Sequence, residues 1–525
     1  MKEGCYLVLD VGTTSVKVSV MDRNFRVKYT SIREYQLEAS GSQVELEPEV
    51  YTRSAAEGIR EAVRAGQVIG LRGIAVTTQG ETLIPVDRDG VPLSKAIVWL
   101  DGRAEDQAKE IQAKIPEDLF YEKTGIPGCN GLCPVSKLLW IREQKPEVYE
   151  QAKYFLLLED YLIFWLTGRF ATEKSLLCTT GYFDIQKDEL WEEILDRFSI
   201  EKEKIPPVYE CGTVVGNVLP VRAEELGLSG NADSGQEGGI PVVTAAMDQI
   251  CSALGAGNCF SGMVTETTGT AMCIGETVER YQLLEKARIP VYRHGVPGKY
   301  MLLAVCMTAG MTLKWFKDVF CRSEQEEAEK NGVSVYEILD QMAESAEPLC
   351  GGLRMLPYLS GSVQPFDAPG LEGSIHGISL RHTKADFVRS IMEGVGFMLR
   401  ENLELLECIT GEKIDKISSM GGGAKGDCWC QIKADISGAV IQAGGQPETT
   451  SAGAAVLCAV GIGDYPSVEE AAQDAGMAGH QENGDRVFCP DDTLTELYAQ
   501  AYREYKAYLE QEVKLSQSLS SAGEE

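Results

Sequence analysis

The alternation of hydrophobic and polar positions predicts short buried strands that are separated by turns and helical stretches. Residues 6–9 form an apolar run that ends at Asp10, and residues 16–22 alternate as a second strand. Residues 240–244 form another buried run, which ends close to Asp248. Strands that alternate with helical segments in this way are typical of an α/β architecture.

The same local order recurs in the second half of the chain. Residues 262–272 again form a strand, a hydroxyl-rich turn with a glycine, and a strand. A chain of 525 residues is also longer than one hydrophobic core usually accommodates. We therefore predict a duplicated domain with a ligand in the cleft, with a first domain over residues 1–255 and a second over residues 256–512. Residues 513–525, rich in Ser, Ala, Gly and Glu, are predicted to be a flexible tail.

The charge balance narrows the class of ligand. The chain has 49 basic and 79 acidic residues, a formal net charge of -30, and no long basic cluster. This balance disfavours nucleic acid and anionic membrane surfaces as partners. We expect small-molecule ligands, and a homodimer stays open as the assembly.

The cysteines and histidines bear on the compartment and on metal binding. Sixteen cysteines are scattered along the chain, and no apolar leader with a cleavage site precedes the first strand. We therefore expect reduced thiols, a cytoplasmic location and no membrane span. Cys428 and Cys430 have no partner pair at zinc-ligand spacing, so a zinc site is not expected.

The first turn combines a carboxylate, a glycine and hydroxyls. Asp10 ends the first strand, and Gly12 lies in the turn that follows. Such a turn can present N–H and O–H donors to phosphate oxygens, and the carboxylate can hold a magnesium ion. The hydroxyl residues are Thr13, Thr14 and Ser15. An ordinary hairpin is the alternative interpretation of this turn taken alone.

Two further turns of the same kind make a nucleotide site the better interpretation. The second is Thr268-Gly269-Thr270, in the other half of the chain. The third, residues 421–423, is a run of three glycines after an apparent strand. Missing side chains there would let an adenine or ribose lie against the backbone. Three such turns in this order indicate a polyphosphate nucleotide, with ATP as the expected ligand.

Phosphorylation of an alcohol needs a group that accepts the hydroxyl proton, because an alcohol is a poor nucleophile until it loses that proton. Asp248 follows a buried strand and precedes Gln249, which places it well for this role. The alternative is that Asp248 caps the helix predicted over residues 250–254, a position that aspartate often occupies.

Several longer stretches follow patterns of one protein family. Residues 373–378 (Gly-Ser-Ile-His-Gly-Ile), followed after seven residues by residues 386–394, resemble the second signature of the FGGY carbohydrate kinases. The other stretches that resemble this family are residues 96–103, 134–141 and 421–427. The resemblance covers roughly residues 5–510. It implies two ribonuclease H-like (actin-like ATPase) domains with a deep cleft, the first binding sugar and the second binding nucleotide.

The resemblance also implies roles for individual residues. Asp248 matches the general base of the family, and Asp10 matches the metal-binding position of its first phosphate motif. The positions that match nucleotide or phosphate contacts are Thr13, Thr14, Ser15, Lys17, Thr268, Gly269, Thr270, Gly310, Lys314, Gly422, Gly423 and Asp427. ATP and Mg²⁺ are the cofactors that the resemblance implies. Plain turn geometry is the alternative for the glycines.

The substrate segment departs from the glycerol kinases, which have an Arg-Glu pair and a tyrosine in their site. This chain keeps Glu81 but has Gly80 in place of the arginine and Leu132 in place of the tyrosine. Losing a bidentate donor and a hydroxyl makes glycerol a poor substrate. The smaller side chains also predict more room, which favours a longer substrate.

An ionised Glu81 only accepts hydrogen bonds, so it should bind substrate hydroxyls rather than a carbonyl oxygen. This favours a xylulose-like pentulose or a longer polyol, with a tetritol, ribulose or another ketose as alternatives. The predicted substrate contacts are Gln79, Gly80, Glu81, Trp99, Asp248 and Gln249. Asp101 and Arg103 either contact substrate or pair with each other. Trp99 either packs against the carbon skeleton of the substrate or is an aromatic residue of the core.

Two other classes of protein share parts of this pattern. A chaperone or filament ATPase would explain the phosphate turns but not the two long signatures or Asp248-Gln249. A non-catalytic sugar sensor would not need to retain Asp10, Asp248 and all the glycine turns together. The sequence therefore favours an ATP-dependent carbohydrate kinase.

Overall fold

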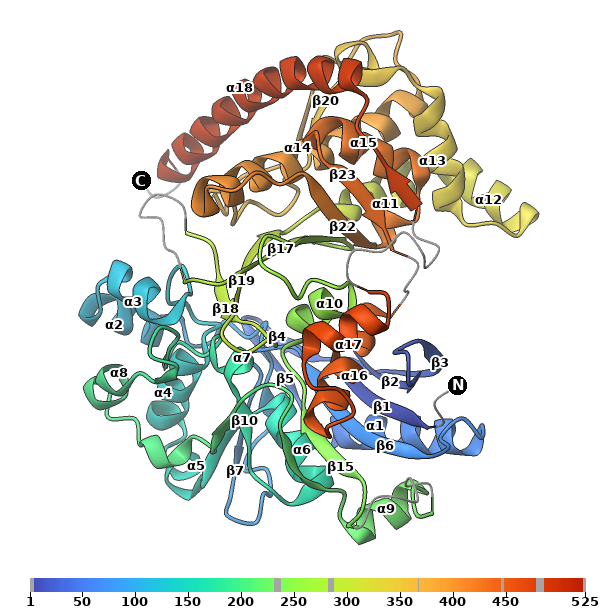
Figure 1. The fold of residues 1–525 in the computed structure, drawn as a ribbon. Coiled ribbons are helices and arrows are strands. Elements are labelled where there is room, and N and C mark those ends of the chain that lie inside the picture. Colours follow the sequence, from blue (N-terminus) through green and yellow to red (C-terminus); the bar gives the residue numbers. More distant parts are fainter. Residues whose placement is uncertain are drawn as a thin grey trace.

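A computed structural model describes residues 4–230, 238–281, 288–366, 368–444, 448–477 and 486–522, with side chains as far as Leu519. It contains two large sheets, each covered by helices, in two halves of the molecule (Figure 1). The glycine-rich residues 230–239 predict a surface loop, and most of it lies outside the described residues.

The first large sheet has six strands in the order β14-β15-β6-β1-β2-β3. Its central strand β1 pairs parallel with β6 and antiparallel with β2, and almost all its side chains are buried. This is why the N-terminal run is continuously apolar. The strands are β1 (Cys5–Val11), β2 (Ser15–Asp22), β3 (Val27–Glu34), β6 (Leu71–Thr78), β14 (Val214–Asn217) and β15 (Pro241–Thr244).

A five-stranded sheet in the order β4-β5-β8-β7-β9 adjoins the first and carries the segment between Glu81 and Trp99. Its strands are β4 (Glu38–Ser40), β5 (Gln43–Leu46), β7 (Leu83–Val86), β8 (Ala96–Ile97) and β9 (Tyr154–Leu157). The helices of this half are α1 (Pro48–Arg64), α2 (Glu105–Lys114), α3 (Glu117–Thr124), α4 (Pro134–Gln144), α5 (Pro146–Gln151), α6 (Leu158–Thr167), α7 (Lys174–Leu177), α8 (Glu192–Arg197), α9 (Pro220–Leu226) and α10 (Asp248–Gly255).

The second large sheet has seven strands in the order β18-β19-β17-β16-β22-β23-β24. These are β16 (Val264–Thr268), β17 (Met272–Val278), β18 (Val291–Arg293), β19 (Tyr300–Cys306), β22 (Lys416–Gly421), β23 (Val440–Ala443) and β24 (Arg486–Phe488). Its helices are α11 (Gly310–Phe320), α12 (Arg322–Asn331), α13 (Val335–Ser345), α14 (Lys384–Thr410), α15 (Asp427–Ser437) and α18 (Asp492–Ala522). Three short two-stranded pairs complete the strands: β10 (Thr172–Glu173) with β13 (Val208–Tyr209), β11 (Phe183–Asp184) with β12 (Glu189–Leu190), and β20 (Arg354–Leu356) with β21 (Ser374–His376).

The chain returns to the first half after β23. Helix α16 (Thr449–Gly461) lies beside α10 and packs on β1 and β6, and α17 (Val468–Asp474) packs against α16 (Figure 1). Helices α10 and α16 cross so closely that their backbones are in contact and leave no room for a side chain. A Cβ on Gly255 would lie 1.8 Å from the Thr449 carbonyl oxygen. One on Gly453 would lie 1.9 Å from the Cys251 carbonyl oxygen. The predicted boundary at residue 255 therefore falls at the end of a helix that packs against both halves of the sequence.

The C-terminal segment differs from the predicted tail over residues 513–525. α18 continues to Ala522. Leu509 is buried and Val513, one turn later, packs against the core, so the apolar face of the helix reaches the first residue of the predicted tail. Leu515 and Leu519, nearer the C-terminus, are exposed.

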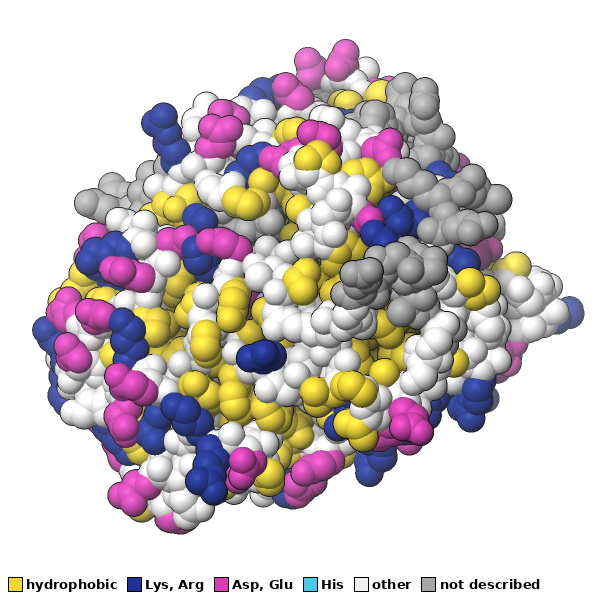
Figure 2. All heavy atoms as spheres, turned by 60° about the horizontal axis from the view of Figure 1, so that its bottom comes forward, with side chains coloured by type: hydrophobic (Ala, Val, Ile, Leu, Met, Phe, Trp, Pro, Cys, Tyr) yellow, Lys and Arg dark blue, Asp and Glu magenta, His cyan; other side chains and the backbone are white. Residues whose placement is uncertain are grey.

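Three global features complete the picture. All sixteen cysteines are free thiols, and most are buried. None of the helices in the described part of the chain combines the length and apolar character that a bilayer span requires. On the face seen in Figure 2, basic and acidic side chains are interspersed among hydrophobic ones rather than gathered by sign.

Candidate active site

The hairpin between β1 and β2 forms the first phosphate-type turn. Gly12 N–H donates to the Ser15 carbonyl at 3.0 Å and closes the turn. Tyr35 buttresses it, because its hydroxyl donates to the Gly12 carbonyl at 2.6 Å. Thr14 is exposed, and Thr13 is half-buried, so the turn presents hydroxyls to the cleft.

Asp10 lies at the end of β1, directly opposite Lys17 on β2. The Lys17 ammonium lies 3.6 Å from Asp10 and 2.7 Å from Glu448, which immediately precedes α16. Burial raises the pKa of Asp10, the positive charge of Lys17 opposes this shift, and Glu448 adds to it. Lys17 thus links the first turn to α16 through two carboxylates.

Asp248 is the first residue of α10, immediately after the turn that follows β15. Its Oδ1 accepts the Gln249 N–H at 2.7 Å, while Met247 occupies the N-cap position. Burial raises the pKa of Asp248 to about 7, and the negative charges of Asp10 and Glu81 contribute to the shift. The carboxylates of Asp10 and Glu81 therefore lie close enough to Asp248 to act on its charge.

Buried side chains hold the backbone of residues 245–247 just before Asp248. Ala245 N–H donates to Glu159 at 3.1 Å, and Met247 N–H donates to the Ser175 hydroxyl at 2.9 Å. The Thr77 hydroxyl donates to the Ala246 carbonyl at 2.7 Å. Sequence reasoning missed these supports, since residues far apart in the chain meet only in the fold. Each position of the turn is fixed by a different element.

The hairpin between β16 and β17 forms the second turn, and Thr268 behaves differently from its prediction. The Thr268 side chain is buried; its hydroxyl donates to Glu266 and accepts from Lys433 at 3.0 Å. Glu266 and Lys433 form a fully buried ion pair at 2.9 Å, and the Ser419 hydroxyl also donates to Glu266 at 2.6 Å. Only the backbone of Thr268 remains for a ligand, whereas Gly269 and Thr270 are exposed.

The glycine-rich turn lies beside the second turn because β22 pairs parallel with β16, with Gly421 opposite Thr268. A Cβ on Gly423 would lie 2.6 Å from the Thr268 Cβ. A Cβ on Gly310, the first residue of α11, would lie 2.2 Å from the Gly269 carbonyl oxygen. Gly423 and Gly310 therefore allow three turns to pack together, while Gly422 stays exposed. The exposed backbone of these turns suits a polyphosphate nucleotide.

Two predicted nucleotide contacts lie on the surface with protein partners. Lys314, on α11, pairs with Asp318 at 2.7 Å one turn away. Asp427, the first residue of α15, is exposed and pairs with Arg486. Both side chains are accessible to a ligand, but no buried residue is seen in the described chain to fix the orientation of either one.

The substrate segment follows β6 with strained geometry. Glu81 has a φ of +56°, a conformation that costs free energy in a residue with a side chain and that clusters at functional sites. Burial raises the pKa of Glu81, and Lys137 opposes the shift. Gln79 is buried, and neither of its amide atoms has a hydrogen-bond partner within the described ranges. Both side chains retain unused hydrogen-bonding capacity.

Gly80 leaves less room than its size predicted. A Cβ on Gly80 would lie 2.9 Å from a methyl carbon of Thr179, a buried residue that follows α7. Thr179 thus occupies the space in that direction, because its hydroxyl is tied to the Leu176 carbonyl at 2.8 Å. No room is left beside Gly80 in the direction of Thr179, and the roomier pocket stays a prediction.

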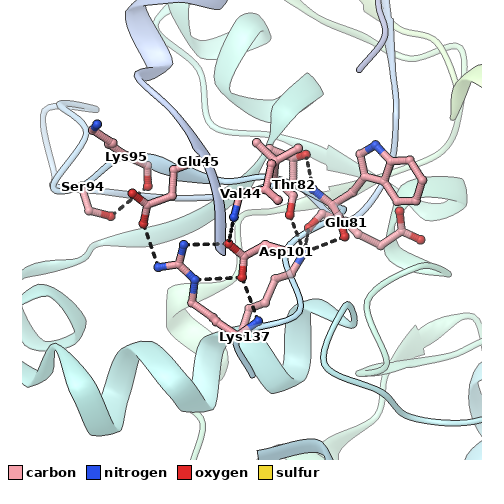
Figure 3. Close-up of polar contacts among 11 residues, drawn as sticks. Val44, Glu45, Glu81, Thr82, Ser94, Lys95, Asp101 and Lys137 are labelled. Atoms are coloured by element: carbon pink, nitrogen blue, oxygen red, sulfur yellow. Dashed lines mark hydrogen bonds and ion pairs between the residues drawn. The ribbon is translucent and has the colours of Figure 1, made fainter. Parts of the chain in front are cut away.

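Lys137, on α4, is buried beneath the substrate segment. Its ammonium donates to the carbonyl oxygens of Glu81 and Val98, each at 3.0 Å, and of Trp99 at 3.3 Å. In Figure 3 the Glu81 carboxylate extends away from this ammonium. Burial lowers the pKa of Lys137, and the nearby carboxylates oppose the shift. Lys137 therefore joins the two backbone segments that carry Glu81 and Trp99.

Asp101 and Arg103 pair with each other, as one of the two predicted alternatives has it. Arg103 donates to both carboxylate oxygens of Asp101, at 2.8 and 2.6 Å, and contacts Glu45 at 2.7 Å (Figure 3). Both side chains are buried. Trp99 is half-buried, and its indole N–H donates to the Thr13 hydroxyl at 3.0 Å, linking the substrate segment to the first turn.

A small cavity lies between α10 and the second sheet. It is lined by Gln249 and Ser252 of α10 and by Cys273, Met301 and Met420 of the sheet. Among the residues that the structure describes, no group of three or more His, Cys, Asp or Glu side chains is placed to hold a metal ion. A magnesium ion would thus need a single carboxylate such as Asp10 together with ligand phosphates, its usual arrangement in nucleotide sites.

The chain matches two family models in succession. Residues 5–255 match the N-terminal domain, and residues 264–462 the C-terminal domain, of the FGGY family of carbohydrate kinases. A xylulose kinase of Staphylococcus epidermidis is 30% identical over 518 residues, covering 98% of each chain. A gluconokinase of Bacillus subtilis is 26% identical over 469 residues, 88% of each chain.

A solved structure agrees with this assignment. The xylulose kinase of Rhodospirillum rubrum superposes with a TM-score of 0.84 at 25% identity, covering 97% of this chain and 99% of that one. The predicted fold of two actin-like ATPase domains is confirmed. The chain belongs to the FGGY family of carbohydrate kinases and is an ATP-dependent phosphotransferase that acts on a sugar.

Proposed function

We propose that the enzyme phosphorylates a hydroxyl of a xylulose-like pentulose or a longer polyol, with Asp248 as the general base. The observation that carries this proposal is the position of Asp248 at the start of α10, with a pKa near 7 and two carboxylates as neighbours. A base with a pKa close to the working pH accepts a proton effectively while a substantial fraction of it is ionised. Ribulose, another ketose or a tetritol is the alternative acceptor.

In this mechanism Asp248 accepts the proton of the substrate hydroxyl as its oxygen attacks the γ-phosphorus of ATP. The hydroxyls and N–H groups of the first turn, and the exposed Gly269 and Thr270 of the second, would hold the phosphates from two sides. Asp10 would hold Mg²⁺, which neutralises charge on the phosphoryl oxygens when it is bound. Gly422 would adjoin the adenosine.

The substrate would bind through Glu81, the unpaired Gln79 amide and Gln249, with Trp99 against its carbon skeleton. Asp10, Glu81 and Asp248 make the cleft negative. The buried ammonium of Lys137 donates to three carbonyl oxygens, so it has no N–H donor left for a ligand carboxylate. A neutral ketose or polyol therefore fits this site better than a sugar acid such as gluconate.

A coupled assay of ADP release tests the substrate class. Pentuloses, hexuloses, alditols and gluconate are supplied in turn with MgATP. We expect turnover with one or more ketoses or polyols and little with gluconate. ATP hydrolysis that no sugar stimulates would instead support a chaperone-type ATPase, and absence of any turnover would support a sensor.

Replacing Asp248 tests the general base. Asp248→Asn should lower kcat by about a thousandfold, since a positioned base contributes roughly 10²–10⁴-fold. The affinity for ADP should stay within about twofold, because the phosphate turns are unchanged. Asp318→Asn, which alters an exposed aspartate of α11, is the matched control. Near-normal kcat in the Asp248 variant would overturn the assignment.

A further inference from the structure

The strand β18 belongs to the second sheet but is docked on the first half of the molecule. Val291 N–H donates to the Gly125 carbonyl at 2.9 Å, and Arg293 N–H donates to the Cys178 Sγ at 3.3 Å. These two anchors flank Tyr292 on either side. The backbone of Tyr292 is therefore held against the walls of the first domain, although the residue comes from the second.

The docking is close and uses several independent contacts. Gly125, with a φ of +73°, approaches so closely that a Cβ there would lie 2.5 Å from the Val291 carbonyl oxygen. The Tyr121 hydroxyl donates to the Ile289 carbonyl at 2.8 Å and accepts the Ile289 N–H at 3.0 Å. β18 therefore has a defined place against α3 and the segment after α7.

The register of the second sheet determines which face Tyr292 occupies. Tyr292 lies opposite Met301, and Met301 lies opposite Thr277 on β17. Residues directly opposite each other share a face of the sheet, as do residues two apart on one strand. Tyr292 is thus on the same face as Met301 and Cys273, the face that meets Gln249 of α10 in the small cavity.

The Tyr292 hydroxyl has unused hydrogen-bonding capacity. Tyr292 is half-buried, and no group in the described ranges hydrogen-bonds to its hydroxyl. Burial raises the pKa of this phenol, and Glu81, Cys178, Cys133 and Cys273 are the groups whose charge adds to the shift. Geometry places it near the same segment: Cys178, which accepts the Arg293 N–H, is followed by Thr179, whose side chain lies beside Gly80, the residue before Glu81.

We propose that Tyr292 contacts the sugar and selects for one of its hydroxyl groups together with Glu81. This inference rests on the proposed function. A sugar hydroxyl both donates and accepts a hydrogen bond, whereas an ionised Glu81 only accepts. A hydroxyl that donates to Glu81 still needs a donor, and the Tyr292 O–H supplies one. The sugar site is completed by a residue of the second domain, so sugar binding couples the two domains.

Steady-state kinetics of Tyr292→Phe test this proposal, because the change removes the hydroxyl and keeps the ring. The KM for the sugar identified in the panel should rise about tenfold. A change of this size corresponds to the loss of one strong hydrogen bond between uncharged groups. The KM for ATP should stay within about twofold. Tyr300→Phe is the matched control: Tyr300 lies on the neighbouring strand, opposite Arg293 and on the other face of the sheet.

Deoxy analogues of the sugar identify the hydroxyl. The analogue that lacks the selected hydroxyl should bind wild type and Tyr292→Phe equally well, while other deoxy analogues should keep the tenfold difference. An unchanged sugar KM in Tyr292→Phe, in an enzyme that loses turnover on Asp248→Asn, would overturn this inference and leave the proposed function standing. Normal turnover in Asp248→Asn would instead overturn the general base, whatever the Tyr292 variant does.

Discussion

The two hairpins that form the phosphate turns share a topology but place their acidic residue differently. In each, two antiparallel strands meet at a glycine turn, and the first strand also pairs parallel with a third, β1 with β6 and β16 with β22. Matching Gly12 to Gly269 aligns Asp10 with Thr267. The acid of the second hairpin, Glu266, then aligns with Leu9, on the buried face.

The difference separates two chemical tasks. In the first hairpin, Asp10 stays near the cleft with Lys17 and influences Asp248 electrostatically. In the second, Glu266 is turned into the core and neutralised by Lys433. The second turn thus offers hydroxyls and N–H groups without a repelling charge, which suits a polyanionic ligand. Negative charge is kept where a metal ion and a proton acceptor are needed.

Breaking the buried pair should have the largest effect. Lys433→Met leaves Glu266 buried without its partner, which should cost about 3–5 kcal/mol of folding free energy. Urea unfolding followed by tryptophan fluorescence measures this loss, and one of the six tryptophans, Trp429, has its ring 5.4 Å from the Lys433 ammonium. Lys17→Met in the first hairpin is the control and should cost less than about 1 kcal/mol, because that pair is partly solvated. Equal losses would show that the two hairpins do not differ in this way.

Removing the acid of the first hairpin should affect activity rather than stability. Asp10→Asn should lower kcat by about a hundredfold, a typical effect of deleting one electrostatic contact to a transition state. The urea midpoint should not fall, because the variant removes a carboxylate whose burial is unfavourable. Thr267→Val, at the aligned position of the second hairpin, is the control, and its kcat should change far less. A full kcat in Asp10→Asn would contradict a role for this carboxylate.

The pH dependence of kcat/KM should show the smallest effect. Asp248 must be ionised to accept a proton, and its pKa is about 7. Activity should therefore rise with pH through 7 and lie about tenfold below its plateau one pH unit lower. Glu81→Gln removes one negative neighbour, so the same limb should move to lower pH. A limb that stays in place would show that Glu81 does not act on Asp248.

Local pattern was sufficient for the parts that depend on neighbours in the chain. The buried strands, the glycine turns and the family signatures around α14 are contiguous in sequence, and the hydrophobic period reveals them directly. Asp248 was found for the same reason, because it follows one buried strand and begins one helix. Its role as general base remains a prediction.

The α/β class, the duplicated hairpins and the kinase family follow from the sequence, since each rests on short contiguous motifs. The packed fold was needed to show that Thr268 faces a buried ion pair, that Thr179 fills the space beside Gly80, and that Asp101 pairs with Arg103. It also brought Lys137 beneath Glu81 and docked Tyr292 against the first domain. The partners in these contacts come from different elements, and the direction of a side chain depends on packing that no local pattern encodes.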